Sequence, residues 1–327
     1  MIDRLIKEHY NIDVSYYTKL GVGAGSNTYY IKTAGGKQFI LKNANINEAN
    51  NPQSEPELCA HLLARGIPVS EFAPDIYGNY IWYDCDDVYH MQKFITGISY
   101  EVHCAPDWLM VEMPKMLGKI HTALSDYKDL PVGIGENFFR CMTPQFALSS
   151  YERSLEYAAT NGYIDLIDSL QYRIKLMSHF DLPEIDLTKL TRTATHGDFF
   201  ISQLICRETE IAAVIDWTSA CVHPVVWEII RSFIYGSPFC KDGIINISEL
   251  VEYTRNYLKY APLNSSDLKM MPYVFYYQIS VCDYFGQYFQ SNADNRYIYL
   301  DQAVLSTKMM RWLEKHAAEL SDALSVI

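Results

Sequence analysis

Two neighbouring segments carry more information than the rest of the chain: THGDFFISQLIC at residues 195–206 and AVIDW at residues 213–217. Asp198 stands on a predicted short turn, and the amide side chain of Gln203 follows at the start of an apolar run. Asp216 ends a second apolar run. This layout is typical of a site that transfers the terminal phosphoryl group of a nucleotide. One carboxylate accepts the proton of the attacking hydroxyl, while an amide and a second carboxylate hold magnesium.

The N-terminal part of the chain matches this interpretation with three short strands. β-type runs are expected at residues 14–20, 28–33 and 38–42. The pair Gly35–Gly36 predicts a hairpin turn between the last two, because adjacent glycines tolerate positive φ. A glycine-rich loop at residues 21–27 separates the first two strands.

This loop does not fit a dinucleotide-binding fold or a P-loop, because both require a helix directly behind the glycines. A glycine-rich hairpin can instead cover a nucleotide with backbone N–H groups facing the phosphates. Gly23, Gly25 and Ser26 are therefore predicted to bind the cofactor. An ordinary flexible hairpin is the alternative for this loop taken alone.

Lys42 closes the third strand, where a lysine reaches the nucleotide phosphates if a carboxylate on the next helix orients it. The run SEPE at residues 54–57 predicts a helix start, with Ser54 as its cap. Glu55 is the preferred partner of Lys42, because its spacing from the apolar stripe places it near the inward face. Glu57 remains a competitor, and a surface ion pair of little consequence is the other alternative.

The rest of the chain predicts an α+β protein with two lobes, residues 1–96 and 97–327. The first is small and β-rich, with further strands over 72–95, and Thr96–Gly97 is a candidate hinge. The second is larger, mostly helical, and carries the catalytic and metal-binding loops. Its helices are expected at residues 109–126, 147–160, 163–180, 224–235, 247–260, 266–290 and 299–320.

Composition narrows the class of protein. The chain has 327 residues, of which 49% are hydrophobic and 20% charged, as in an ordinary globular protein. No apolar run reaches the roughly 18 residues that span a bilayer. The N-terminus lacks the apolar core of a signal peptide, so a cytoplasmic location without membrane contact is expected. Eight cysteines are scattered without a C-x-x-C pair, which argues for reduced core residues rather than a zinc or redox site.

The net charge of -12 and the absence of a basic stripe in the sequence argue against a nucleic-acid partner. An acidic surface favours a cationic small substrate electrostatically, but solubility alone is the preferred explanation of the charge. The sequence does not indicate an oligomeric state.

Together these motifs resemble the aminoglycoside phosphotransferase and choline kinase family, which has a protein-kinase-like fold. Within that family the chain is similar to the branch of bacterial homoserine kinase and spore-coat-associated kinase-like proteins. The resemblance covers about residues 15 to 235. It is carried by LGVGAGSN at 20–27, FILK at 39–42, LLARGIPV at 62–69, LGKIH at 117–121, HGD at 196–198 and VIDW at 214–217.

The resemblance implies a role for each matching position. Asp198 would be the catalytic base, and Asp216 would hold magnesium. Lys42 would bind the nucleotide phosphates with Glu55 as its partner. Gln203 stands where the family usually has asparagine, the second metal ligand.

This departure at Gln203 leaves three outcomes open. Glutamine keeps the hard carbonyl oxygen that magnesium prefers but adds a methylene, and magnesium tolerates little error in ligand geometry. The backbone can retreat so that Gln203 still binds the ion, a water can bridge the two, or the site is impaired. The last outcome would give a nucleotide-binding protein that acts through partners.

Other positions have supporting roles. The resemblance implies that His196 holds the turn that presents Asp198 and that Glu228 braces this loop. His121 is interpreted as a core histidine. The segment from Met91 to Ile95, including Gln92 and Phe94, is expected to line the adenine pocket, mainly through its backbone.

An aromatic-rich run at residues 271–289 has two interpretations. It would either wall the acceptor pocket, with Asp283 or Tyr284 touching the substrate, or form a helix buried in the C-terminal lobe, which is the preferred interpretation. The expected function is transfer of the γ-phosphoryl group of ATP or GTP, bound with Mg²⁺ between the lobes, to a hydroxyl of a small molecule. A hydrolase built on Asp198 and Asp216 is disfavoured, because it would leave the glycine-rich hairpin and Lys42 without a task.

Overall fold

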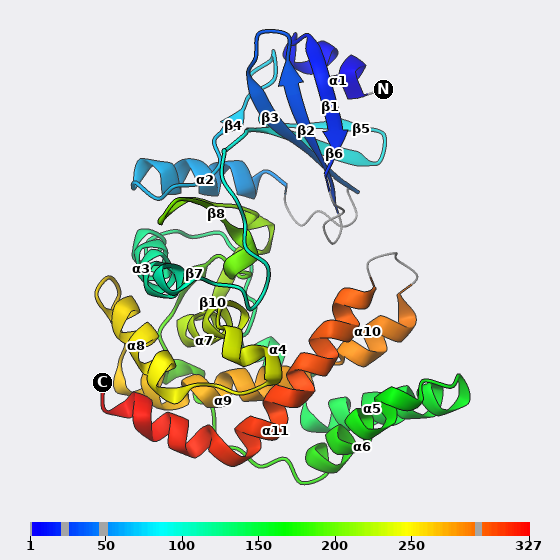
Figure 1. Ribbon diagram of the computed structural model, residues 1–327, viewed down its shortest axis with the longest axis vertical. Coiled ribbons are helices and arrows are strands. Elements are labelled where there is room, and N and C mark those ends of the chain that lie inside the picture. Colours follow the sequence, from blue (N-terminus) through cyan, green and yellow to red (C-terminus); the bar gives the residue numbers. More distant parts are fainter. Residues whose placement is uncertain (1, 21–25, 46–51, 292–295) are drawn as a thin grey trace. The chain divides into compact units, whose positions relative to one another are not determined.

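The computed structural model describes residues 2–20, 26–45, 52–291 and 296–327 (Figure 1). The chain forms two compact units. The first contains residues 1–99 together with residues 202–220, and the second contains residues 100–201 together with 221–327. The segment 202–220, which the sequence analysis assigns to the C-terminal lobe, thus packs with the N-terminal residues.

The first unit is built on an antiparallel sheet with neighbours in the order β1-β2-β3-β6-β4, and β5 pairs with β6 (Figure 1). The strands expected from the sequence are confirmed, but Lys42 does not end the third one, because β3 continues to Asn45 in register with β2 and β6. Their bounds are β1 (Val14–Lys19), β2 (Ser26–Thr33), β3 (Gln38–Asn45), β4 (Phe72–Ala73), β5 (Ile81–Asp84) and β6 (Asp87–Lys93). The turn before β3 contains Gly36 at φ 81°, the positive value that the paired glycines predict.

Helix α1 (Ile2–Tyr10) covers part of this sheet. Its buried residues Ile2, Ile6 and Tyr10 recur every four positions, so one helical face meets the core. The indole N–H of Trp82 donates to the Tyr10 hydroxyl at 3.0 Å, and the rings of Trp82 and Tyr89 stack at 4.1 Å. The helix is therefore attached to the sheet by both apolar contact and a buried hydrogen bond.

Helix α2 (Ser54–Ala64) and a β-hairpin complete the first unit. The helix begins one residue earlier than the predicted cap implies, because Gln53 occupies the cap position without a side-chain hydrogen bond. The hairpin is formed by β8 (Leu204–Arg207) and β9 (Glu210–Val214), the two apolar runs that follow Asp198 and precede Asp216.

The second unit is mostly helical. Its helices are α3 (Asp107–Ala123), α4 (Glu136–Cys141), α5 (Pro144–Thr160), α6 (Ile164–Met177), α7 (Val225–Gly236), α8 (Ile247–Leu258), α9 (Ser265–Val281), α10 (Tyr284–Gln290) and α11 (Tyr297–Ser325). Helix α9 packs against α7 and α11, and α5 packs against α6 (Figure 1). Among the described helices, none is both long enough and apolar enough to cross a membrane.

The prediction of one helix over residues 266–290 is wrong. The chain forms α9 and α10 with a break at Cys282–Asp283. The carboxylate of Asp283 accepts the backbone N–H of Gly286 at 2.8 Å and so caps the start of α10. Aspartate favours such caps over helix interiors because its side chain competes for backbone N–H groups.

A two-stranded sheet in the second unit positions the loop that contains Asp198. It pairs β7 (Arg192–Thr195) with β10 (Cys221–Pro224), so that Thr195 lies opposite Cys221. The loop that follows β7 therefore starts from a fixed strand end, directly beside the strand that leads into α7.

Candidate functional site

Lys42 and Asp216, which are far apart in sequence, meet within the first unit. Lys42 lies on β3 opposite Thr28 of β2 and His90 of β6. Its Nζ is 3.1 Å from Oδ1 of Asp216. Burial alone would lower the pKa of Lys42, but the carboxylates of Glu55 and Asp216 outweigh burial and hold this pKa above its ordinary value. Lys42 is therefore a charged ammonium at neutral pH.

Glu55 is buried beside this pair. Its Oε1 accepts the backbone N–H of Trp217 at 3.2 Å, directly after Asp216. Burial raises the pKa of Glu55, and the attraction of Lys42 offsets this only in part. Glu57, the competing partner, is exposed. The structure thus brings Glu55 to Lys42, and the inward spacing of Glu55 on its helix explains why.

The β8–β9 hairpin brings the two predicted metal ligands to neighbouring strand ends. Leu204 pairs with Val214, and the backbone N–H of Ile215 donates to the backbone oxygen of Gln203 at 2.9 Å. Asp216 then adopts a left-handed conformation with φ 66°. This turn presents its carboxylate to Lys42 and leaves 39% of the side chain exposed.

The donor chemistry at this hairpin fits a hard cation. A carboxylate and an amide supply oxygen ligands, the type that Mg²⁺ prefers, and magnesium usually takes only one or two protein ligands and completes its shell with phosphates and water. Among the residues that the structure describes, no group of three or more His, Cys, Asp or Glu gathers to hold a metal. The fit therefore rests on Asp216 and Gln203.

The glycine-rich loop lies largely outside the described residues. Gly23 and Gly25, two of its predicted nucleotide-binding positions, belong to that undescribed part. Ser26 is the first residue of β2, where its backbone is in register with Ala44 of β3. The roles predicted for these three residues stay predictions.

The segment expected to contact adenine continues β6. Gln92 is buried, its amide nitrogen lies 3.3 Å from Nε2 of His90, and its side chain hydrogen-bonds Glu55. Phe94 follows the strand, and its backbone N–H donates to the carbonyl of Gln38 at 3.1 Å. Gln92 thus contacts Glu55, the partner of Lys42. The sequence did not suggest this contact.

Asp198 lies in the second unit on a tight turn. Gly197 has φ 77°, a conformation that glycine adopts without strain. The backbone N–H of Asp198 donates to Nδ1 of His196 at 3.3 Å, consistent with the turn-holding role predicted for this histidine. Oδ1 of Asp198 accepts a hydrogen bond from Nη2 of Arg231 at 2.6 Å.

Glu228 of α7 braces the same loop. It is fully buried, and its Oε1 accepts the backbone N–H of Phe199 at 3.3 Å. Its Oε2 accepts a hydrogen bond from Nε2 of His121 at 2.9 Å. Burial alone would raise the pKa of Glu228. The hydrogen bond from His121, together with the electrostatic effect of nearby His196, outweighs burial and lowers this pKa to about 2. An ionised carboxylate therefore holds the residue that follows Asp198.

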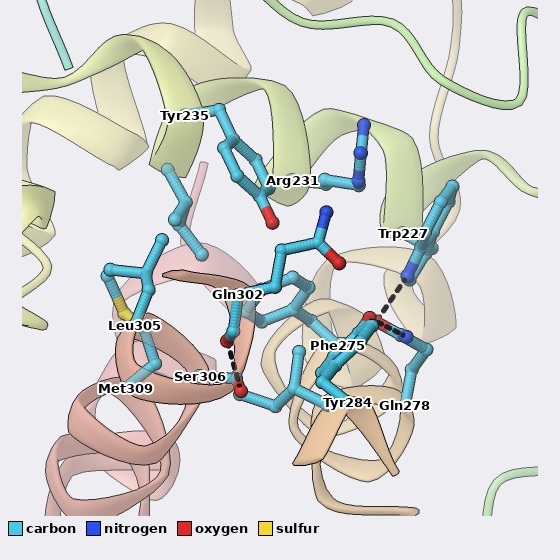
Figure 2. A pocket seen from close by; sticks show the side chains of 12 residues that line it. Trp227, Arg231, Tyr235, Phe275, Gln278, Tyr284, Gln302, Leu305, Ser306 and Met309 are labelled. Atoms are coloured by element: carbon cyan, nitrogen blue, oxygen red, sulfur yellow. Dashed lines mark hydrogen bonds between the residues drawn. The ribbon is translucent and has the colours of Figure 1, made fainter. Parts of the chain in front are cut away.

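A cavity of about 210 Å³ lies in the second unit among α7, α9, α10 and α11 (Figure 2). Phe275, Gln278 and Tyr284 of the aromatic run line it, together with Arg231. The preferred interpretation of this run as buried helix is confirmed for most of α9. That these positions wall an acceptor pocket stays a prediction. Asp283 caps α10 instead of lining this cavity.

Sequence analysis missed two residues of these clusters. Arg231 contacts Asp198, and its only sequence signal is its position three residues after Glu228, on the same helical face. His90 lies with Nε2 3.9 Å from Oε2 of Glu55. Burial and the charge of Lys42 lower the pKa of His90 to about 3, so it packs there as a neutral ring.

Known structures of similar fold were found over nearly the whole chain. Amicoumacin kinase hAmiN, in complex with AMP-PNP and Ca²⁺, has 14% identity and a TM-score of 0.65, covering 98% of this chain and 92% of that one. A microcompartment-associated aminopropanol kinase has 13% identity and a TM-score of 0.63, covering 98% of each chain. Spectinomycin phosphotransferase APH(9)-Ia has 15% identity and a TM-score of 0.60, covering 100% and 98%.

The fold is thus that of small-molecule kinases, and the predicted α+β class is confirmed. The model of the phosphotransferase enzyme family, APH, matches residues 17–262, so the chain belongs to this family. The family predicted from the sequence motifs is confirmed. A search of curated proteins found no match.

Proposed function

We propose that this protein is an ATP- or GTP-dependent kinase that phosphorylates a hydroxyl group of a small molecule. The observation that carries the proposal is the arrangement of Lys42 and Asp216 around the buried Glu55 in the first unit. Kinases require a lysine that binds phosphates, a carboxylate that orients it and an aspartate that holds magnesium. Three such groups, brought together from a strand, a helix and a hairpin end, support this reaction better than a hydrolase.

Each residue has a defined task in this reaction. Lys42 binds nucleotide phosphate oxygens, and Glu55 keeps its ammonium group in place. Asp216 and Gln203 would hold Mg²⁺, which when bound neutralises negative charge on the phosphates. Mg²⁺ is the natural ion for this oxygen donor set.

Asp198 is the proposed base. It takes the proton of the acceptor hydroxyl, whose oxygen forms a bond to the γ-phosphorus. The bond from the γ-phosphorus to the bridging oxygen breaks, and its electron pair leaves with the nucleoside diphosphate. Glu228 contributes by holding the backbone next to Asp198, so that the carboxylate is preorganised.

The solved relatives support a small-molecule acceptor without selecting one. Their names refer to acceptors as different as spectinomycin and aminopropanol. The identities of 13–15% support the fold and not a shared acceptor.

Nucleotide binding tests the first part of this proposal. We expect calorimetric titration with AMP-PNP and Mg²⁺ to show binding to wild-type protein and an unchanged dissociation constant for Glu57→Gln. The dissociation constant of Glu55→Gln should be higher by about tenfold or more. Glu57 is the matched control, because it is exposed on the same helix. Equal affinities of the two variants would contradict the role of Glu55.

Phosphoryl transfer tests the second part. ADP release is measured with a panel of small alcohols, and the reaction product is identified by mass spectrometry. The variant Asp198→Asn should lose transfer by at least a hundredfold and keep AMP-PNP affinity. Turnover comparable to wild type in this variant would refute the assigned base.

A nucleotide-binding protein with impaired transfer is the second candidate, and Gln203 in place of the family asparagine is the observation that favours it. The variant Gln203→Asn separates the two candidates. A large gain in transfer rate would mean that the native site is impaired, whereas a loss would mean that the hairpin is adapted to glutamine.

A further inference from the structure

The cavity of the second unit is lined by a positive charge and by no negative one, although the net charge of the protein is -12. Arg231 is its only charged member, and no Asp, Glu or Lys stands among the described residues that line it. Figure 2 shows Trp227, Arg231 and Tyr235 on α7, and Gln302 extends towards them from α11. An occupant of this cavity therefore meets a guanidinium, amides, a hydroxyl and aromatic rings.

Arg231 has an unsatisfied donor. Its side chain is only 12% exposed, and Nη2 donates to Asp198 at 2.6 Å. Its Nη1 is buried and has no hydrogen-bond partner among the described residues. A buried donor of a charged group that stays unpaired is costly. Such a group marks a place where an acceptor atom is expected to bind.

Arg173, a second buried arginine of the same unit, provides a structural comparison. Its three nitrogens donate to side-chain and backbone oxygens, including the hydroxyls of Tyr151, Ser306 and Thr307. Both arginines lie over aromatic rings, so only their hydrogen bonds distinguish them. Arg173 therefore behaves as a completed structural group, whereas Arg231 does not.

We propose that the cavity binds an acceptor that carries a carboxylate as well as the reacting hydroxyl, and that Nη1 of Arg231 binds this carboxylate. The proposal rests on the assignment of Asp198 as the base. Arg231 would then hold Asp198 with one nitrogen and the acceptor with the other, which fixes the distance between the hydroxyl and its base. Guanidinium groups suit this task, because their planar donors bind carboxylates in a defined geometry.

Size and charge restrict the acceptor further. A cavity of about 210 Å³ is smaller than the roughly 300–1,000 Å³ of pockets for drug-sized ligands, so a molecule of a few carbons fits better. A cationic acceptor would meet Arg231 in the lining, while the carboxylate that pairs with Arg231, that of Asp198, is not among the described lining residues. The structure therefore favours a small hydroxycarboxylic acid over an amino alcohol.

Binding measurements test this directly. The probes are 3-hydroxybutyrate and 4-hydroxybutyrate, each beside its uncharged primary amide, and dissociation constants come from ligand-observed NMR with AMP-PNP and Mg²⁺ present. We expect at least one carboxylate to bind about tenfold or more tightly than its amide. Equal binding of each acid and its amide, or no binding of either acid, would overturn the proposal.

Two variants locate the binding group. Arg231→Lys keeps the charge but removes the planar fork, and should weaken carboxylate binding by about tenfold or more while leaving the amide unaffected. Arg311→Lys is the matched control, because Arg311 pairs with Asp168 at 2.7 Å but is exposed. Equal effects of the two substitutions would overturn the assignment.

The variant Asp198→Asn provides a readout that a purely structural arginine would not give. In wild-type protein one guanidinium serves two carboxylates. Removing the charge of Asp198 removes the repulsion between its carboxylate and that of the ligand, so that Arg231 interacts with one carboxylate only. The acid should therefore bind about tenfold more tightly, although transfer is lost. Unchanged or weaker binding of the acid would contradict a shared guanidinium.

Failure of this proposal and failure of the proposed kinase activity are distinguishable. Tight binding of an acid without any transfer in wild-type protein would support the carboxylate site and refute the kinase reaction. Phosphorylation of an amino alcohol or a neutral alcohol by a protein that binds no acid would do the reverse.

Discussion

Replacing Glu228 with glutamine removes one negative charge from the centre of the second unit and changes little else in shape. Glu228 is fully buried and accepts hydrogen bonds from His121 and from the backbone of Phe199. The glutamine amide keeps one acceptor oxygen, but its NH₂ group faces a donor where the carboxylate had an acceptor. Glutamine thus resembles the protonated form of Glu228, which makes the cost of the substitution calculable from the pKa of this carboxyl.

The magnitude follows from the depressed pKa. The folded value of about 2 against the ordinary 4.5 corresponds to about 3 kcal/mol of unfolding free energy at pH 7. Charged hydrogen bonds contribute about 1.5–3 kcal/mol each, which is the same order. Because the folded pKa is lowered, this stabilisation is present above pH 4.5 and is lost as the pH falls towards 2. At pH 3 it should be roughly 1.4 kcal/mol.

The assay is urea unfolding of wild-type protein and Glu228→Gln at pH 7 and at pH 3, followed by tryptophan fluorescence. The control is Glu252→Gln, an exposed glutamate 3.6 Å from Arg255, which should change stability by less than about 0.5 kcal/mol. A cost for Glu228→Gln below about 1 kcal/mol at pH 7 would refute the reasoning, and so would a cost that grows as the pH falls.

Three further substitutions test the packing that positions the site. Gly97→Ala should destabilise the protein by about 1–3 kcal/mol in urea unfolding, because its Cβ would lie 2.6 Å from the backbone oxygen of Cys206; no change would mean that the hairpin shifts freely. Tyr10→Phe removes the acceptor for Trp82 and should cost about 1–2 kcal/mol, with faster hydrogen exchange in α1. Arg173→Met should cost about 3–5 kcal/mol, measured as loss of thermal stability, and a neutral effect would mean that its hydrogen bonds are replaceable.

Local patterns predicted which faces Lys42 and Glu55 occupy in the first unit, but not the contacts of His90 and Gln92 with Glu55. Lys42 lies within a run of alternating burial, and Glu55 stands at helical spacing from Leu58 and Leu62, so each side chain has one possible face. The meeting of Gln203 with the residues before Asp216 also follows from local sequence, because two short apolar runs joined by a turn form a hairpin. These relationships are fixed by periodicity and need no knowledge of distant contacts.

The ion pair of Arg231 with Asp198 could not be predicted in the same way. Asp198 follows β7, and Arg231 lies on α7, which follows β10. No local pattern predicts that β7 pairs with β10, and an arginine on a helix is more often a surface residue. The break at Asp283 is a different kind of error. Aspartate is itself a usable N-cap signal, but the aromatic spacing of the run masked it.

The net charge of the chain and the proposed carboxylate site point to acceptors of opposite charge, and there is a physical reason to give the local site more weight. The total of -12 is summed over the whole surface, and at physiological ionic strength charges farther than about 8 Å from a ligand are largely screened. A buried guanidinium is screened much less, so Arg231 dominates the potential inside the cavity that it lines. Its partner Asp198 removes part of that potential but satisfies only Nη2. In the proposed site, the local balance at two atoms of one side chain, and not the composition of the chain, would therefore select the charge of the acceptor.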